Sequence, residues 1–320
     1  MSAAVPEIMS TPRWRVAVTG ATGLVGQRLV PALLAAGHRV DRLTRRPPAA
    51  GTTDVQWDPQ RARLDPRALE GVDAVVHLAG ESIAARRWSR SVKERIRRSR
   101  VDGTRLLSET LGRLERRPRV LVSASAVGYY GDRGEAPLTE DSPPGNGFLA
   151  DVCREWEAAA DAARAAGIRV VHPRLGLVLA REGGALPRMA LPFRLGMGGV
   201  VGSGRQYWSW IELGDLVRAI ELCLGLDGLA GPVNAAAPGP VTNREFTRAL
   251  GKVLGRPTLV PLPAVAVRLL LGEMGQALLL GSARVLPRRL DRAGFHFRHP
   301  DLPSALRAAL SDEARPGAPA

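Results

Sequence analysis

Cysteine is scarce in this chain of 320 residues, which contains only Cys153 and Cys223. Their separation matches no metal-ligand spacing, and two cysteines cannot build a disulfide framework. This excludes a small secreted domain held by disulfides and predicts a reducing, cytoplasmic setting without a bound metal. Residues 1–15 have no apolar core of the signal-peptide kind, so we expect no secretion signal.

Long apolar runs are also missing. The most apolar stretch, residues 264–281, is interrupted by Arg268 and Glu273. That pattern favours a packed helix over a membrane span, so we expect no membrane association. Apolar residues make up 45% of the chain, an ordinary value for a globular protein with an ample core.

Lysine is almost absent, because Lys93 and Lys252 are the only two among 45 basic residues. The net charge of +14 raises the possibility of a nucleic-acid-binding protein. The arginines, however, are scattered in ones and twos and are not interleaved with aromatic residues, which form only 4% of the chain. We therefore expect no nucleic-acid partner and interpret the arginine excess as codon bias, although a basic surface also attracts anionic nucleotides.

From Arg15 to about residue 180, short apolar segments alternate with segments of helical periodicity. We expect strands at 15–20, 38–45, 54–58, 73–80, 118–125 and 168–179, and helices at 23–37, 92–114 and 148–167. Strands that alternate with crossover helices predict an α/β protein with a Rossmann-type, doubly wound parallel sheet.

The segment "TGATGLVG" connects the first expected strand to the first helix and places Gly20, Gly23 and Gly26 in a G-x-x-G-x-x-G arrangement. Glycines at this turn let the backbone approach a pyrophosphate, and the N-terminus of the helix offers free N–H groups. We expect dinucleotide binding here, with Thr22, Leu24 and Val25 also at the phosphates. The alternative is a tight turn with no ligand.

The end of the second strand predicts which dinucleotide binds. Thr44 stands where an NAD enzyme often has an acid, and Arg45 and Arg46 follow it. Guanidinium groups bind a 2′-phosphate, so we predict NADP(H) as the cofactor. Asp41 lies three residues earlier and is badly placed to reach the ribose. The alternative is that both arginines are solvated surface charge.

With these residues, the chain resembles the extended short-chain dehydrogenase/reductase superfamily of the sugar epimerase/dehydratase type. The motifs that carry the resemblance are "TGATGLVG", "HLAG", "SASAVGYYG", "PRLGLVL" and "WIELGDLVRAI". A narrower match to an atypical branch, often described as epimerase-family or cell-division-inhibitor-like, rests on "LAGESIAARRW", "GSGRQYWSWI" and "LPRRLDRAGFHF".

The resemblance implies several site residues. Leu78, Ala79 and Gly80 would line the adenosine and ribose side, Trp57 and Asp58 would border the adenine, and Pro173 and Arg174 would lie near the nicotinamide. Ser125 matches the catalytic serine or threonine, and its alternative role is a strand-end serine bonded to the backbone. Asp215 matches a helix-opening acid, for which capping of that helix is favoured over catalysis.

The superfamily's catalytic tyrosine normally precedes a lysine by four residues, and this chain departs from that pattern. Aligning Asp151 with the lysine puts Gly147 at the tyrosine, and a shift by one gives Val152 and Phe148. No tyrosine in the chain has a lysine four residues later. Tyr129 and Tyr130 remain candidate proton donors, with Arg133 a possible substitute cation. A tyrosine with a pKa near 10 donates a proton better than it abstracts one, which favours reduction.

The stretch from Gly196 to Trp210 is too rich in glycine for a packed element. We expect a mobile flap over the cleft, with Arg205, Tyr207 and Trp208 contacting the substrate. The alternative is a loop resting on a second domain.

The remaining chain suggests a smaller, mainly helical substrate domain. We predict a Rossmann domain of residues 12–180 and 211–238, a substrate domain of residues 181–210 and 239–310, and disordered tails at 1–11 and 311–320. Residues 211–240 look like one more helix and strand on the sheet. The expected cleft lies between the two domains.

These observations predict an atypical NADP(H)-dependent oxidoreductase that reduces a small carbonyl substrate. One alternative is an NADP(H)-binding sensor or interaction protein without catalysis, and another is a nucleotide-sugar epimerase or dehydratase. The helix at 92–114 and the helix after the fifth strand, where the superfamily commonly pairs, are heavily charged here. We therefore expect a monomer or a weak homodimer.

Overall fold

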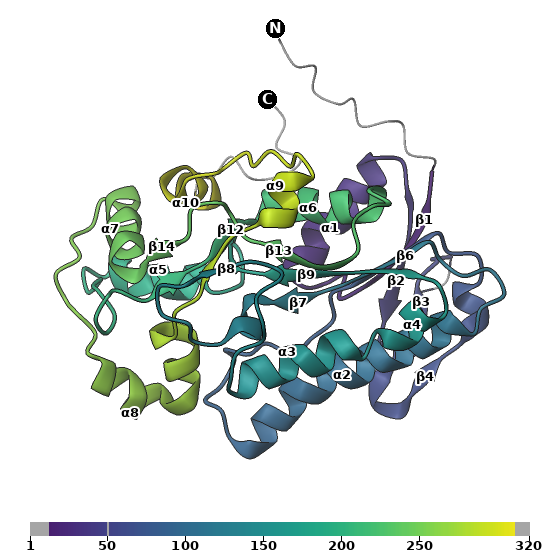
Figure 1. The fold of residues 1–320 in the computed structure, drawn as a ribbon, viewed down its shortest axis with the longest axis horizontal. Coiled ribbons are helices and arrows are strands. Elements are labelled where there is room, and N and C mark those ends of the chain that lie inside the picture. The colour runs from purple at the N-terminus through teal and green to yellow at the C-terminus, as the bar shows by residue number, and fades with distance from the viewer. Residues whose placement is uncertain (1–12, 50, 311–320) are drawn as a thin grey trace, which may run out of the picture.

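The computed structural model describes residues 13–49 and 51–310 (Figure 1), so the predicted disorder of residues 1–11 and 311–320 lies outside the described residues. The strands are β1 (Arg15–Thr19), β2 (Arg39–Thr44), β3 (Val55–Asp58), β4 (Arg63–Leu64), β5 (Ala74–His77), β6 (Val120–Ser123), β7 (Ser125–Ala126), β8 (Pro137–Leu138), β9 (Arg169–Leu175), β10 (Leu177–Leu179), β11 (Tyr207–Trp208), β12 (Trp210–Glu212), β13 (Gly231–Ala235), β14 (Val241–Thr242) and β15 (Arg284–Val285). The α-helices are α1 (Leu24–Ala35), α2 (Arg90–Gly112), α3 (Phe148–Ala158), α4 (Asp161–Ala165), α5 (Leu186–Arg194), α6 (Leu213–Gly225), α7 (Asn243–Leu254), α8 (Ala264–Gly275), α9 (Arg288–Arg292) and α10 (Leu302–Leu310).

The main sheet has the order β13-β9-β6-β5-β1-β2-β3-β4, and β7 also pairs with β9. All these pairs are parallel except β3 with β4, which is antiparallel. The order reverses between β1 and β5, as in a doubly wound sheet. The predicted α/β class is therefore confirmed, and β13 is the additional strand expected after α6.

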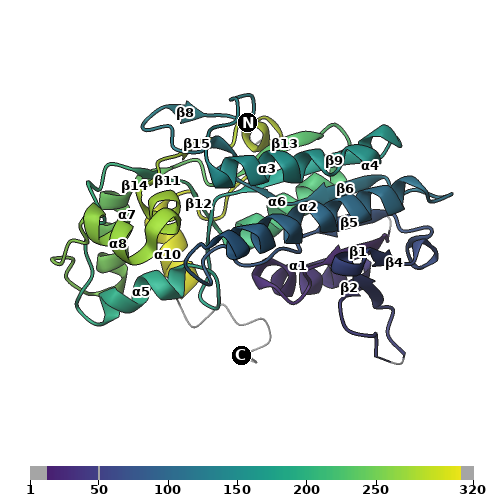
Figure 2. The ribbon, with the colours of Figure 1, turned by 90° about the horizontal axis from the view of Figure 1, so that it is seen from below.

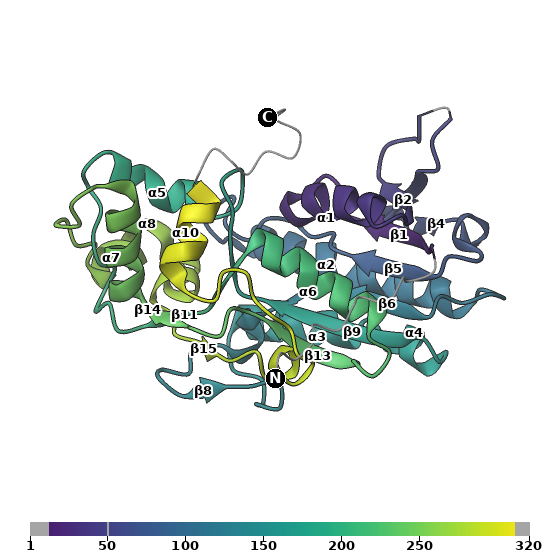
Figure 3. The ribbon, with the colours of Figure 1, turned by 90° about the horizontal axis from the view of Figure 1, so that it is seen from above.

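Helices cover both faces of the sheet. Figure 2 shows α2 and α3 running along one face, and Figure 3 shows α1 and α6 on the other. Leu29 and Leu33 of α1 face the sheet because they are four residues apart, and they are fully buried with Ile220 of α6. On the opposite face, Leu107 and Leu111 of α2 pack in the same way.

A second apolar core lies among the C-terminal helices, α5, α7 and α10, which stand together at one end of the molecule (Figure 1). Its largest side chains are Trp208 and Trp210, with Phe246 of α7 and Leu306 of α10 packed in the same cluster. A small helical substrate domain requires a core of its own, and this cluster is such a core. The domain boundaries given above remain predictions. Among the described residues, none of the helices is both long and apolar enough to cross a membrane.

Candidate functional site

The turn after β1 is a glycine cradle. Gly20 has φ +67°, and a Cβ atom there would lie 2.8 Å from the carbonyl carbon of Leu78. A Cβ atom on Gly26 would lie 2.2 Å from the carbonyl oxygen of Gly20. Both positions therefore admit only glycine. The strand, the turn and α1 thus approach one another as closely as a backbone phosphate site requires.

The N-terminus of α1 is free to receive an anion. The helix begins at Leu24. Its cap residue, Gly23, has no side chain that could bond to the first N–H groups, and its first turn contains no acidic residue. Thr22 and Gly23 are exposed, and Val25 is half-buried. The first N–H groups and the positive end of the helix dipole are therefore available to a phosphate group.

Thr19 fixes the chain at the end of β5, beside the cradle. Its Oγ1 accepts hydrogen bonds from the N–H groups of Leu78 (3.1 Å) and Ala79 (3.2 Å) and lies 2.7 Å from Nδ1 of His77. Because the hydroxyl oxygen already accepts twice, its proton points to His77, whose Nδ1 is then an acceptor. Burial lowers the pKa of His77 to about 4, so this histidine is a neutral packing residue.

The end of β2 presents two unpaired cations. Arg45 and Arg46 are exposed, and neither forms an ion pair with a described residue. Asp41, in contrast, is fully buried and accepts a hydrogen bond of 2.5 Å from Nε of Arg15. The acidic residue of this strand thus points away from the ligand edge, and Thr44 uses its hydroxyl to bind the carbonyl oxygen of Arg46 (2.7 Å).

Trp57 and Asp58 have local structural contacts that the resemblance did not indicate. Trp57 is 3% exposed and packs in the core with its ring 5.8 Å from that of His77. The carboxylate of Asp58 accepts from the N–H groups of Gln60 and Arg61 and caps a short 3₁₀ turn. Inward orientation of alternate residues in β3 explains the burial of Trp57, and contact of Trp57 and Asp58 with an adenine remains a prediction.

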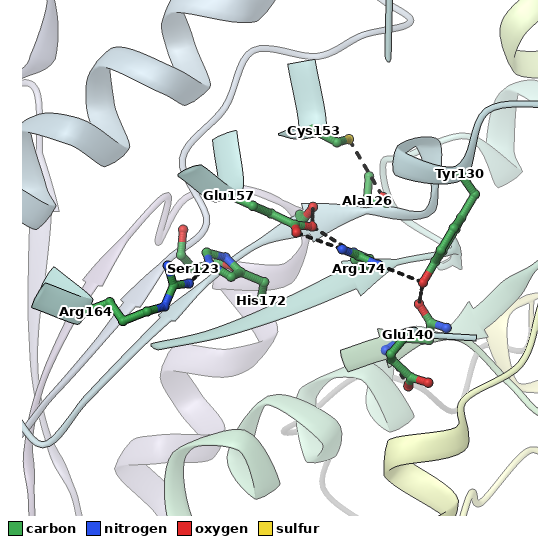
Figure 4. Close-up of polar contacts among 11 residues, drawn as sticks. Ser123, Ala126, Tyr130, Glu140, Cys153, Glu157, Arg164, His172 and Arg174 are labelled. Atoms are coloured by element: carbon green, nitrogen blue, oxygen red, sulfur yellow. Dashed lines mark hydrogen bonds and ion pairs between the residues drawn. The ribbon is translucent and has the colours of Figure 1, made fainter. Parts of the chain in front are cut away.

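A buried polar network extends across β7, β9 and α3 (Figure 4). The hydroxyl of Ser125 donates to Oε1 of Glu157 at 2.6 Å, and Arg174 donates to both oxygens of Glu157 at 2.8 Å. Nη1 of Arg174 donates to the hydroxyl of Tyr130 at 2.9 Å, and that hydroxyl donates to Oδ1 of Asn234 at 2.6 Å. Burial opposes the charge of Arg174, but the hydrogen bonds and charge of Glu157 outweigh it and raise the pKa of Arg174.

The network also contains Arg174, one of the two residues expected near the nicotinamide. Pro173 and Arg174 lie near the carboxyl end of β9 and are buried, and their proximity to the nicotinamide remains a prediction. The guanidinium of Arg174 is directed at Glu157 on α3, and each of its three nitrogens already donates to Glu157 or Tyr130. Sequence reasoning missed Glu157 and Asn234, because no motif marks either as a partner of the serine strand.

The two tyrosines have different surroundings. Tyr130 is fully buried, and its burial raises the pKa of the phenol to about 12 despite the nearby charge of Arg174. Tyr129 is half-buried, with the Cζ atom of Arg174 3.4 Å from its ring centroid, and its hydroxyl makes no hydrogen bond to a described residue. The hydroxyl of Tyr130 is thus engaged with Arg174 and Asn234, whereas that of Tyr129 has no partner among the described residues.

A cavity of about 410 Å³ adjoins this network and is lined by Tyr129, Glu157, Arg174, His172, Arg164 and Asp161, among others. Nε2 of His172 lies 3.3 Å from the guanidinium of Arg164, which can only donate. Nδ1 of His172 therefore carries the proton and donates to the carbonyl oxygen of Ser123 at 3.2 Å. Burial lowers the pKa of His172, so this ring is neutral and held by two bonds.

One face of α3 lies toward the serine strand. It carries Leu149, next to Gly128, Cys153, whose Sγ lies 3.7 Å from the carbonyl oxygen of Ala126, and Glu157, which accepts from Ser125. These residues are spaced four apart, and none is a tyrosine or a lysine. Burial raises the pKa of Cys153 to about 12, so its thiol is not a substitute base.

The glycine-rich stretch from Gly196 to Trp210 is bonded to α7. This arrangement favours the second expectation for this stretch, a loop that rests on the other domain, over a mobile flap. The N–H of Val201 donates to Oδ1 of Asn243 at 2.8 Å, and the N–H of Leu262 donates to the carbonyl oxygen of Val200 at 2.8 Å. These bonds tie the stretch to two other segments of the C-terminal region. Glycine is required where Gly199 approaches Val260, because a Cβ atom there would lie 1.9 Å from the Val260 carbonyl oxygen.

The three expected substrate residues of this stretch lie in three environments. Arg205 is exposed, and its N–H donates to the hydroxyl of Ser203. Tyr207 is half-buried, with the guanidinium of Arg284 5.2 Å from its ring centroid. Trp208 is buried in the core with its ring 5.2 Å from that of Phe246, which is a packing role. Substrate contact remains a prediction for Arg205 and Tyr207 and does not fit the burial of Trp208.

The C-terminal helices close against the segment that follows β5. Nη1 of Arg188 on α5 donates to the carbonyl oxygen of Ala84 at 2.7 Å. Nζ of Lys93 on α2 lies 2.9 Å from Glu273 on α8. A second cavity of about 360 Å³ lies between the start of α2 and residues 81–86.

The parallel sheet and the glycine cradle at its carboxyl edge define a Rossmann-type protein of short-chain dehydrogenase/reductase architecture. Residues 16–233 match the family described as "NAD dependent epimerase/dehydratase family", and residues 262–309 match a domain of unknown function, DUF1731. The chain therefore belongs to the NAD dependent epimerase/dehydratase family.

The relatives include proteins of similar length. Epimerase family protein Mb2239 of Mycobacterium bovis is 45% identical over 302 residues, which cover 94% of this chain and 98% of that protein. The crystal structure of human epimerase family protein SDR39U1 (isoform 2) with NADPH is 36% identical, with a TM-score of 0.85, over 93% of this chain and 99% of that one. A nucleoside-diphosphate sugar epimerase of Corynebacterium glutamicum is 37% identical, with a TM-score of 0.78, over 93% of this chain and 58% of that one.

Proposed function

We propose that this protein is an NADP(H)-dependent oxidoreductase that reduces a small carbonyl compound. The observation that carries the proposal is the end of β2, where Arg45 and Arg46 are exposed without a carboxylate partner while Asp41 is buried against Arg15. A 2′-phosphate supplies the acceptor oxygens that two free guanidinium groups bind. The human relative, crystallised with NADPH, supports the same cofactor.

The residues present fit a dinucleotide. The cradle of Gly20, Gly23 and Gly26 leaves no room for a Cβ atom at two of its positions, and the uncapped N-terminus of α1 offers N–H donors. These groups would hold the pyrophosphate, and Arg45 and Arg46 would hold the 2′-phosphate. When bound, NADPH supplies a hydride to the substrate carbon.

The direction of the reaction follows from the available proton donor. Hydride addition leaves negative charge on the carbonyl oxygen, which then takes a proton from a nearby hydroxyl, and solvent restores that hydroxyl. We assign the donor to Tyr129, since its hydroxyl is free whereas that of Tyr130 donates to Asn234. The proton of Ser125 is directed at Glu157, so this serine orients the network unless the substrate displaces that bond.

Two alternative functions have observations in their favour. Burial of both Ser125 and Tyr130 within a closed network favours an NADP(H)-binding sensor that does not turn over its cofactor. The relationship to a nucleoside-diphosphate sugar epimerase suggests epimerisation instead. A panel of small carbonyl compounds separates them, since a reductase oxidises NADPH, a sensor binds it without turnover, and an epimerase converts nucleotide sugars without net consumption of free cofactor.

The affinities for NADPH and NADH test the cofactor assignment directly. In Arg45→Ala/Arg46→Ala, we expect NADPH binding to weaken by roughly 10- to 100-fold with little change for NADH, because hydrogen bonds to charged groups are lost. Arg42→Ala is a matched control, because Arg42 lies in the same strand and is paired with Asp54 at 2.9 Å. Tighter binding of NADH by the wild type, or an unchanged affinity for NADPH in the double variant, would overturn the assignment.

A further inference from the structure

Arg100 of α2 lies against the backbone at the end of β5. A Cβ atom on Gly80 would be 3.3 Å from Cζ of Arg100 and 3.5 Å from both of its terminal nitrogens. Gly80 is exposed and follows the Thr19-bound residues Leu78 and Ala79. The guanidinium therefore sits beside the carboxyl edge of the sheet, in the space that any larger side chain at Gly80 would fill.

The hydrogen bonds of Arg100 engage only one of its nitrogens. Nη1 donates to the carbonyl oxygens of Glu81 (3.0 Å) and Ile96 (3.2 Å) and to the hydroxyl of Ser99 (3.4 Å). Nη2 and Nε make no hydrogen bond with the described residues, and no carboxylate of the described chain forms an ion pair with this guanidinium. Nε and Nη2 are thus available to donate to a ligand.

Arg100 is partly buried beside an aromatic ring. Its guanidinium lies 5.1 Å from the ring centroid of Trp156, close enough to the thiol of Cys153 to affect its pKa. Burial lowers the pKa of Arg100, yet an arginine remains protonated in a protein. A guanidinium with unused N–H donors binds a ligand that brings acceptor oxygens to it.

The strand order indicates which part of a dinucleotide reaches Arg100. β1 stands between β2 and β5, so the pyrophosphate cradle of Gly20 lies between Arg45 at the end of β2 and Gly80 after β5. If the 2′-phosphate half lies over β2, the other half must extend over β5. Arg100 is on that second side, beside Gly80, which this inference places toward the nicotinamide half and not on the adenosine side that the resemblance implied.

We propose that Arg100 binds the nicotinamide half of the cofactor, with Nε and Nη2 donating to the hydroxyls of its ribose. This inference rests on the proposed NADP(H) function and adds the residue that anchors the reacting end. The planar fork of the guanidinium matches two neighbouring hydroxyl oxygens and places a positive charge beside the nicotinamide ring, at a position that the sequence did not mark.

Fragment binding tests this assignment without measuring turnover. The variants are Arg100→Met and, as a control on the same helix, Arg98→Met, since Arg98 is exposed and paired only with Glu94 at 2.7 Å. The ligands are NADPH and 2′,5′-ADP, which lacks the second ribose and the nicotinamide. In Arg100→Met, we expect roughly 10- to 100-fold weaker binding of NADPH and less than about 3-fold change for 2′,5′-ADP. Arg98→Met should leave both affinities unchanged.

The possible results distinguish a failure of the Arg100 assignment from a failure of the proposed NADP(H)-dependent function. If the wild type binds NADPH and Arg100→Met binds it equally well, the assignment of Arg100 is overturned while the proposed function stands. If the wild type binds no NADPH, the proposed function fails first. Equal losses for NADPH and 2′,5′-ADP would show a general structural role and also overturn the assignment. Arg100→Lys, which keeps the charge without the fork, should recover part of the lost NADPH affinity.

Discussion

The hydroxyl of Ser125 donates a hydrogen bond of 2.6 Å to Oε1 of Glu157, and the same oxygen accepts from Nε of Arg174 at 2.8 Å. A serine at the end of the central strands is thereby tied to a buried ion pair on the α3 side of the sheet. The bond sets the direction of the serine proton, and the ion pair holds the carboxylate that receives it. The four predictions below follow from this network and the neighbouring cradle.

Glu157→Gln should destabilise the protein by about 3–5 kcal/mol, because it leaves the charge of Arg174 buried without its partner. Urea denaturation measures the change. Glu155→Gln is the matched control on the same helix, since Glu155 pairs with Arg97 at the exposed surface and should contribute less than about 1 kcal/mol. Similar losses in both variants would contradict a special role for the Ser125–Glu157–Arg174 contact.

Tyr129→Phe and Tyr130→Phe should change different properties: Tyr130→Phe should lower stability, and Tyr129→Phe should lower kcat. Tyr130→Phe removes the hydroxyl that links Arg174 to Asn234, leaving buried polar groups unpaired at a cost of about 1–3 kcal/mol in the free energy of unfolding. Tyr129→Phe should change stability by less than about 0.5 kcal/mol but lower kcat for carbonyl reduction by roughly 100-fold. Thermal melts and steady-state rates on the same preparations distinguish them. An unchanged kcat in Tyr129→Phe would exclude it as the proton donor.

Gly26→Ala should abolish NADPH binding and lower the free energy of unfolding by about 2 kcal/mol or more, because its new methyl group would overlap the carbonyl oxygen of Gly20. The control is Gly228→Ala, at an exposed position where a Cβ atom meets nothing within 4 Å. Calorimetric titration with NADPH and thermal denaturation give the two readouts. Normal NADPH binding by Gly26→Ala would show that the turn is not the phosphate site.

Stability should fall between pH 7 and pH 5 because of His77. Its pKa is about 4 when folded and near 6.5 when unfolded, so the unfolded chain binds the proton first as the pH drops. The contribution is fully present above about pH 6.5, declines toward pH 4, and amounts to about 2 kcal/mol lost at pH 5. His172, whose pKa burial also lowers, adds to the same slope.

Denaturation at several pH values in His77→Gln measures the contribution of His77. In His77→Gln, the free energy of unfolding should fall by about 2 kcal/mol less between pH 7 and pH 5 than in the wild type, whatever the stability of the variant at pH 7. His296→Gln, at an exposed histidine, serves as the control and should keep the wild-type slope. A wild-type slope in His77→Gln would show that the buried imidazole is not the group that titrates.

Much of the fold could be predicted because its signals are local. The glycines at 20, 23 and 26 lie between an apolar strand and an amphipathic helix, and the alternation of strands with helices along residues 15–180 predicts the parallel sheet. The sequence also predicted that Asp41 would not reach the ribose, because Asp41 lies three residues before Thr44 in β2. Asp215 shows the limit of local reasoning: it opens α6, but Glu212 caps the helix, whereas Asp215 accepts from the N–H groups of Arg298 and His299.

The sequence by itself determined the sheet, the phosphate turn, the two arginines after β2 and the lack of a tyrosine with a lysine four residues later. Only the tertiary structure decided that Trp57 and Tyr130 are buried, that Ser125 is bonded to Glu157, and that Arg100 lies beside Gly80. Backbone periodicity and turn chemistry act between neighbours in the chain, and a sequence records them directly. Side-chain pairing joins residues from different strands and helices, and its partners are fixed only when the sheet and helices pack.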